Sequence, residues 1–294
     1  MRQRQVACWI FADMGGSSLT LLRYLMRLAQ VSVPVIVIAH GLFEPLGWNP
    51  APLPENLPGM RGPSLPNLRM VVLGEHIMEA LRDCPLHSRE DIRLLPHPVL
   101  EIAHSQAASP ATHHFVFPGV PDKGLASFAG LAANVNEGAQ RASFSVAGFA
   151  SGEEDANSLS HLTGIAQFPL SVREYFSRLS EATYGIWFTT HEPNPYQYRA
   201  SGTIPDLLAS GKPAVFKRNS MVDTYFRNYG AVGHQCDTWP ELVQRVKEMS
   251  AQPPAAILPA HRSAVERARQ ALLPRSLAPV FREIALAPKL ANHV

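Results

Sequence analysis

The residues with the clearest chemical meaning stand together in one stretch, 193–216, which reads PNPYQYRASGTIPDLLASGKPAVF. A short helix is expected to begin in its Ser201-Gly202-Thr203 turn, because Thr203 can cap a helix and a first turn tolerates Pro205. The free N–H groups and the positive dipole end at the start of a helix favour bound anions. The turn therefore predicts a site for a phosphorylated ligand.

Apolar strands flank this helix. TYGIWF, residues 183–188, leads into the stretch, and PAVF, residues 213–216, follows Gly211, which suits the position just past a helix end. Earlier, Ser171 and Glu174 form a capping box that opens another helix. Further apolar runs and helical segments alternate before it, at 114–117, 125–135, 143–147 and 163–168. Such alternation predicts a doubly wound parallel sheet with helices on both faces.

The first half begins with another strand, helix and strand. Apolar residues 6–12 lead to Gly15 and Gly16, a helical pattern capped by a serine follows, and the β-branched run 33–39 ends at His40. Gly15 and Gly16 would let a ligand or a second domain approach the backbone closely, although a simple tight turn explains them equally well. His40 is expected at the carboxyl edge of the sheet, where open α/β sheets bind ligands.

Residues 98–112 contain prolines and no regular pattern of apolar residues, and they separate the two halves of the chain. We expect a smaller N-terminal α/β domain at 1–105, with a long loop at 42–66. A Rossmann-like C-terminal domain that ends in helices is expected at 106–294.

Composition and residue spacing argue against several classes of protein. A formal net charge of +2, without a basic arm, gives no reason to expect a nucleic-acid partner. Cys8, Cys84 and Cys236 are too widely spaced for a zinc site or a disulfide framework, and a reducing cytoplasm suits them. His97 and the pair at 113–114 have no ligand spacing either, so no metal is expected. The apolar start is too short for a spanning helix.

Four pieces of the second half resemble, in order, the nucleotide-sugar-binding domain of GT-B glycosyltransferases, particularly family 4 (group 1). FVFPGVPDKGLASFAGL is similar to the first strand with its Lys-Gly turn, and ASFSVAG to the next strand. TGIAQFPLSVREYFSRLSEATYGIWF resembles the base-binding loop, helix and strand, and SGTIPDLLASGKPAVF the acidic helix. The first hundred residues match less well, and this half is short for the family. Either it is a compact variant, or a partner or missing sequence supplies part of the acceptor side.

The resemblance implies an α/β protein of GT-B fold and a metal-independent transferase of hexosyltransferase type. It would move a sugar from a UDP- or GDP-linked donor to a glycan or lipid-linked acceptor, as in polysaccharide biosynthesis. The nucleotide sugar is a substrate, and no cofactor is implied. A cytoplasmic location is expected, with peripheral association with the inner membrane face as an option. The alternatives are a non-catalytic nucleotide-sugar-binding module or partner subunit, and a nucleotide-sugar epimerase.

The resemblance also implies which residues hold the donor diphosphate. Lys123 matches the family lysine that neutralises it, and a fixed cation there contributes most in the transition state, when the leaving diphosphate gains charge. Ser201, Gly202 and Thr203 would donate to the same phosphates. Arg199 could replace an arginine that the family carries near the first strand. The alternatives are a solvated lysine and a plain helix cap.

Other family positions concern the nucleoside and the sugar. Asp206 matches the acidic residue that holds the ribose hydroxyls. Tyr198 falls where the family has its first acidic residue, which contacts the donor sugar, and Glu192 is a nearby substitute. Phe168 and Leu170 match the loop that flanks the nucleobase, although core packing would explain them equally well.

Catalytic roles follow for the first half. The resemblance implies that His40 approaches the donor sugar. Asp13 is the candidate general base should the enzyme invert, because a carboxylate there could deprotonate the acceptor hydroxyl. Gly15 and Gly16 are counted with the donor-binding candidates. Whether the reaction retains or inverts the anomeric configuration stays open.

Overall fold

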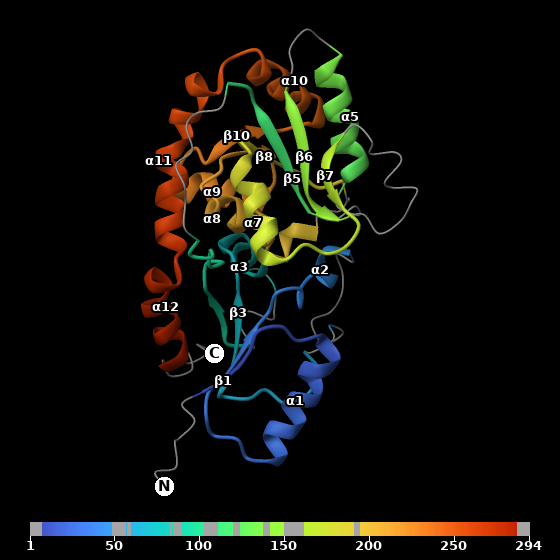
Figure 1. Cartoon of the computed structure of the whole chain (residues 1–294). Helices are drawn as coiled ribbons and strands as arrows, with labels where there is room; N and C mark the ends of the chain where they lie inside the picture. Colours follow the sequence, from blue (N-terminus) through green and yellow to red (C-terminus); the bar gives the residue numbers. More distant parts are fainter. Residues whose placement is uncertain are drawn as a thin grey trace. The chain divides into compact units, whose positions relative to one another are not determined.

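The computed structural model describes residues 8–48, 57, 60–82, 84, 90–102, 111–119, 124–137, 142–149, 162–190 and 195–286 (Figure 1). Contacts within the chain divide it into two compact units. The first unit comprises Met1–His97, His191–Ser201 and Arg275–Val294, and the second comprises Pro98–Thr190 and Gly202–Pro274. The domain limits expected at residues 105 and 106 remain a prediction.

The first unit contains a four-stranded parallel sheet in the order β1-β2-β3-β4. Its strands are β1 (Trp9–Phe11), β2 (Val35–Ile38), β3 (Leu68–Val72) and β4 (Ile92–Leu94). Helix α1 (Gly16–Leu28) connects β1 to β2, and α3 (Glu75–Leu81) connects β3 to β4. The connection between β2 and β3 contains a short helix, α2 (Pro45–Trp48), so the long loop expected at 42–66 is not wholly irregular.

Both faces of this sheet are covered. Val35 and Val37 pack in one cluster with α1 and α3, whereas Ile36 packs in another with Leu277 and Ile284 of α12 (Pro274–Leu286). Neighbouring side chains of a strand point to opposite faces, so a strand covered on both sides is apolar throughout. The C-terminal helix is therefore the second layer of the first unit.

The second unit contains a six-stranded parallel sheet in the order β10-β9-β8-β5-β6-β7. Its strands are β5 (His114–Pro118), β6 (Ser143–Phe149), β7 (Thr163–Ala166), β8 (Tyr184–Trp187), β9 (Ala214–Lys217) and β10 (Gly233–Cys236). Counted within the unit, this order is 6-5-4-1-2-3, the Rossmann arrangement. The strand order reverses between β5 and β8, which pair directly. The predicted doubly wound sheet is confirmed.

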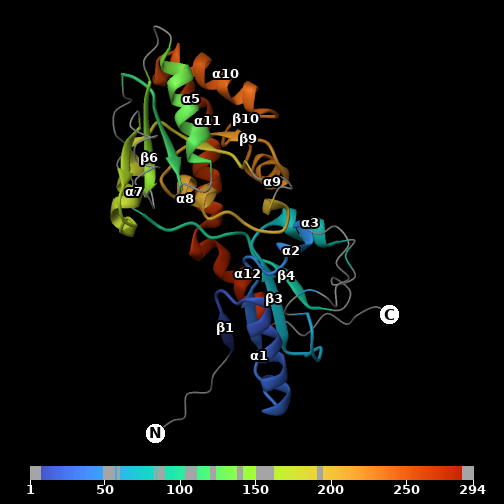
Figure 2. The same cartoon turned by 90° about the vertical axis from the view of Figure 1, so that its right-hand side faces the viewer.

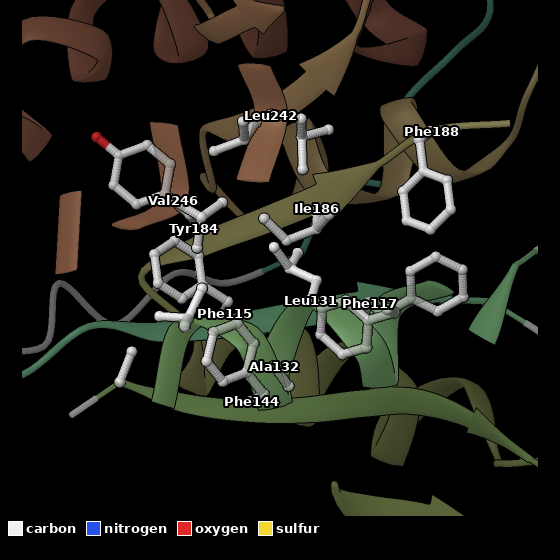
Figure 3. Close-up of a cluster of buried hydrophobic side chains, with 14 of the residues drawn as sticks. Phe115, Phe117, Leu131, Ala132, Phe144, Tyr184, Ile186, Phe188, Leu242 and Val246 are labelled. Carbon is white, nitrogen blue, oxygen red and sulfur yellow. The ribbon is translucent and has the colours of Figure 1, made fainter. Parts of the chain in front are cut away.

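Six helices of the second unit are described: α5 (Leu125–Asn136), α7 (Val172–Glu181), α8 (Thr203–Ala209), α9 (Ser220–Tyr229), α10 (Trp239–Ser250) and α11 (Pro254–Leu272). Helices α5 and α10 lie side by side over one face of the sheet (Figures 1 and 2). Figure 3 shows Leu131 of α5 and Leu242 and Val246 of α10 with the aromatic side chains of β5, β6 and β8. This packed layer holds the strand ends in place.

Two of the helix-end predictions made from the sequence are confirmed, and one is wrong. The capping box at α7 is confirmed, since the Ser171 hydroxyl accepts from the Glu174 N–H and the Glu174 carboxylate accepts from the Ser171 N–H. Gly211 follows α8 with φ +66°, as expected. Thr203 is not the cap of α8, because Gly202 occupies that position and Thr203 is the first helical residue. Within the described residues, no helix is long and apolar enough to cross a membrane.

Candidate functional site

The carboxyl ends of β5 and β8 mark the position where a doubly wound sheet binds its ligand. Strand β5 ends at Pro118 and Gly119, and β8 is followed by Phe188, Thr189 and Thr190. These residues meet because the two strands are neighbours at the point of reversal. The candidate site is built around them.

Gly124 brings the start of α5 to the same place. It is the N-cap of α5, has φ +107°, and as a glycine has no side chain that could cap the helix. A Cβ at Gly124 would lie 2.7 Å from Cε2 of Phe188 and 3.1 Å from Cγ2 of Thr190. Both the positive φ and the close approach require glycine. The N–H groups of the first turn of this twelve-residue helix therefore lie beside the end of β8.

Gly148, near the end of β6, lies against the backbone at the end of β5. A Cβ at Gly148 would fall well inside the van der Waals distance of the Gly119 carbonyl oxygen. The Gly119 N–H donates to the Ala147 carbonyl at 3.2 Å. Backbone therefore packs against backbone at this edge, with no room for a side chain between the strand ends.

Asp206 has a partner that sequence reasoning missed. The hydroxyl of Tyr175, on α7, donates to Oδ2 of Asp206, on α8, at 3.0 Å. Burial, and then the adjacent carboxylate, raises the pKa of Tyr175 above its usual 10, so the phenol keeps its proton and remains a donor. The two residues lie 31 positions apart, so no local pattern in the sequence points to this pair.

The other predicted donor-binding residues of the second unit lie at two helix starts. Gly202 and buried Thr203 open α8. Phe168 is 76% exposed in the loop before α7, which excludes core packing for it, and Leu170 is half-buried. Lys123 lies outside the described residues.

Two of the catalytic candidates, Asp13 and His40, belong to the first unit. Asp13 is exposed before α1, and Gly15 and Gly16 are the N-cap and first residue of that helix rather than a separate turn. The helix cap therefore lies two or three residues before the serines predicted for it, Ser17 or Ser18. His40 follows β2, and its ring centroid lies 6.5 Å from that of His97.

Tyr198, Arg199 and Ser201 also belong to this unit. Tyr198 is half-buried against the core of the first unit, and Ser201 is buried. The Arg199 guanidinium donates to both carboxylate oxygens of Glu44 at 3.1 Å. Glu192 lies outside the described residues. No group of three or more metal-ligating side chains occurs in the described part of the chain.

Comparison with known proteins supports the fold alone. No model of a protein family matches the sequence, and no curated protein matches it. Solved structures do match. OtsA superposes with a TM-score of 0.65 at 9% identity, over 94% of this chain and 72% of the OtsA chain.

Two further solved structures also superpose on this chain. WaaG, a glycosyltransferase involved in lipopolysaccharide biosynthesis, has a TM-score of 0.55 at 10% identity, over 90% of this chain and 81% of WaaG. A TarM variant from S. aureus, in complex with Fondaparinux, alpha-GlcNAc-glycerol and UDP, has a TM-score of 0.57 at 11% identity, over 92% of this chain and 59% of TarM. The chain has the GT-B fold. The predicted fold class and the resemblance to GT-B glycosyltransferases are thereby confirmed at the level of structure.

Proposed function

We propose that this protein is a GT-B glycosyltransferase that transfers a sugar from a nucleotide-sugar donor bound to its second unit. One observation carries the proposal. Where the Rossmann sheet reverses its order, the start of α5 packs at Gly124 against Phe188 and Thr190 after β8. Backbone N–H groups at that edge suit the diphosphate of a nucleotide sugar.

Residues around this edge have distinct tasks in the proposal. Lys123, which precedes Gly124 in the sequence, supplies the cation that stabilises the departing diphosphate. The Tyr175 hydroxyl orients the Asp206 carboxylate, which can accept further hydrogen bonds from the ribose hydroxyls. Phe168 presents an exposed ring to the nucleobase.

The finer features of the reaction also belong to the proposal. The acceptor is a glycan or lipid-linked, hexosyl transfer needs no metal, and the protein works in the cytoplasm or at the inner membrane face. UDP is the first nucleotide to test, because TarM was solved with it. His40 and Asp13 are the acid–base candidates of the first unit, and the stereochemistry stays open.

A second candidate is a nucleotide-sugar-binding module without catalysis. Tyr198 favours it, because it replaces the acidic residue expected at that position and is half-buried against the core. Burial, and then nearby Cys84, raises the pKa of Tyr198, so it carries no charge at neutral pH. Nucleotide release from a panel of nucleotide sugars, with and without acceptor, separates the candidates. A transferase releases nucleotide faster with acceptor, whereas a binding module releases none in either case.

We expect UDP to raise the melting temperature, and Lys123→Ala to weaken UDP binding roughly tenfold, because one charge-assisted contact to phosphate contributes about 1.5 kcal/mol or more. Thermal unfolding with increasing UDP measures both effects. Lys247→Ala is the matched control, since Lys247 lies in the last turn of α10, which runs back to the opposite edge of the sheet. The absence of any effect of UDP or GDP would contradict the proposed donor site.

Asp206→Ala tests the ribose contact separately. It should weaken UDP binding about fivefold or more while leaving inorganic pyrophosphate binding unchanged, because pyrophosphate lacks ribose. Tyr175→Phe should have the same pattern with a smaller loss, since only the orienting hydrogen bond is removed. Lys123→Ala should weaken both ligands, and isothermal titration compares them. Equal losses of UDP and pyrophosphate in Asp206→Ala would show that Asp206 does not read the ribose.

A further inference from the structure

Helix α1 of the first unit has an apolar side that no described residue covers. Leu21, Tyr24, Leu25 and Leu28 are each between 52% and 80% exposed. Their spacing of three and four residues places them on one side of the helix, and we call this stripe the α1 surface. The opposite side buries Leu19, Arg23 and Met26. Four large apolar side chains on one exposed stripe of a helix indicate a docking surface.

The edge strand adds an aromatic residue on the same side of the sheet. Trp9 of β1 is 40% exposed and pairs in register with Val35, which packs with α1. Alternation along the strand places Trp9 on the same face as Phe11, which packs against the α1 cluster. Figure 2 shows β1 and α1 together at the N-terminal end of the chain.

Among the described residues, the exposed charges near the α1 surface are positive. Arg27 is exposed on α1, which contains no acidic residue. Arg61 is exposed in the loop 60–67, which also lacks carboxylates, and a Cβ at the following Gly62 would lie 3.4 Å from the Tyr24 ring. Arg23 instead turns inward, where its Nη2 lies 3.0 Å from Glu90.

These charges decide between two partners of the α1 surface. In a two-fold dimer, Arg27 and Arg61 would meet identical cations, with no carboxylate on α1 or the 60–67 loop to pair with them. Anionic lipid headgroups would match both arginines, leucines suit the boundary between headgroups and acyl chains, and Trp and Tyr favour that depth. Asp13, the nearest carboxylate in the sequence, precedes the other end of the helix from Arg27.

We propose that the α1 surface docks this protein onto a bilayer containing anionic lipid, with Arg27 and Arg61 on the headgroup phosphates. This proposal deepens the proposed function, since it assigns the membrane contact to named residues. Only the biological purpose of the docking rests on the proposed function. A lipid-linked acceptor would be presented at such a surface.

Vesicle sedimentation with the whole chain tests the proposal. We expect binding to phosphatidylcholine vesicles that contain about a third phosphatidylglycerol, weakened at high salt, and little binding to phosphatidylcholine alone. Leu25→Ser with Leu28→Ser should lower the affinity at least about tenfold, since two apolar contacts are lost. Arg27→Gln with Arg61→Gln should remove the preference for anionic lipid.

Leu100→Ser with Val172→Ser is the matched control, because these second-unit side chains are 51% and 67% exposed and should not affect vesicle binding. Stabilisation by UDP, measured on every variant, separates this proposal from the donor site. No binding to either vesicle would overturn the docking proposal. A dimer in analytical ultracentrifugation that the leucine variant dissociates would overturn it in favour of a second copy of the chain.

Discussion

Replacing Gly148 with alanine is expected to lower the free energy of unfolding of the second unit by more than about 3 kcal/mol, at the upper end of overpacking effects. The added methyl group would meet the Gly119 carbonyl oxygen, which is backbone and cannot rotate away. The ends of β5 and β6 would have to separate. Because Gly119 is part of the candidate site, any folded variant should also be stabilised less by UDP.

Urea unfolding, followed by far-UV circular dichroism, measures the loss. Gly130→Ala is the matched control: it is the same substitution on the exposed side of α5, where an added Cβ meets nothing within 4 Å. Alanine favours a helix over glycine by about 1 kcal/mol, so this control should be slightly more stable than the natural protein. Equal unfolding midpoints for the two variants would contradict the close backbone contact.

Acidification from about pH 7.5 to about pH 5 is expected to destabilise both units, by about 2 kcal/mol for buried His76 and by less for half-buried His234, where solvent screens the charge. Burial lowers the pKa of His76 to about 4 in the first unit. Burial, and then the nearby His261, lowers the pKa of His234 to about 4 in the second. In the unfolded chain both titrate near 6.5 and bind protons that the folded chain does not bind. Stability is therefore full above about pH 6.5 and falls as the pH drops towards 4.

Burial keeps both rings neutral, and hydrogen bonds fix which nitrogen of each ring carries the proton. His76 Nε2 donates to the Arg199 carbonyl at 3.2 Å. His261 Nδ1 donates to the Ala231 carbonyl at 3.0 Å, so its Nε2 accepts from His234 Nε2, 3.3 Å away. Protonating His261 would remove that acceptor, and protonating both rings would place two cations in contact.

Two glutamine variants assign the effect to each unit. His76→Gln should reduce the pH dependence of the first unit, and His234→Gln that of the second, since glutamine can donate a hydrogen bond and does not titrate in this range. Urea unfolding of the natural protein and of both variants at both pH values measures how much stability each loses on acidification. An unchanged pH dependence in both variants would show that other groups cause the acid sensitivity.

Much of the fold was predictable because local interactions encode it. The alternation of apolar runs and helices in the second half predicted a doubly wound sheet, which the strand order confirms. The Ser171–Glu174 capping box and Gly211 depend on contacts within a few residues, so their outcome is visible in the sequence. The cap of α8 was misassigned from Thr203, because Ser, Gly and Thr all suit that position.

The candidate site could not be predicted in the same way, because it depends on contacts between residues far apart in the sequence. Nothing near Tyr175 in the sequence points to Asp206, and nothing near Gly124 points to Phe188 and Thr190. These contacts exist because the strand order brings the ends of β5 and β8 together and sets α7 beside α8. For the same reason, the return of α12 to the first unit, where it covers Ile36, could not be read from its own residues. Periodicity and capping specify each helix and strand, whereas the order of the strands specifies which of them meet.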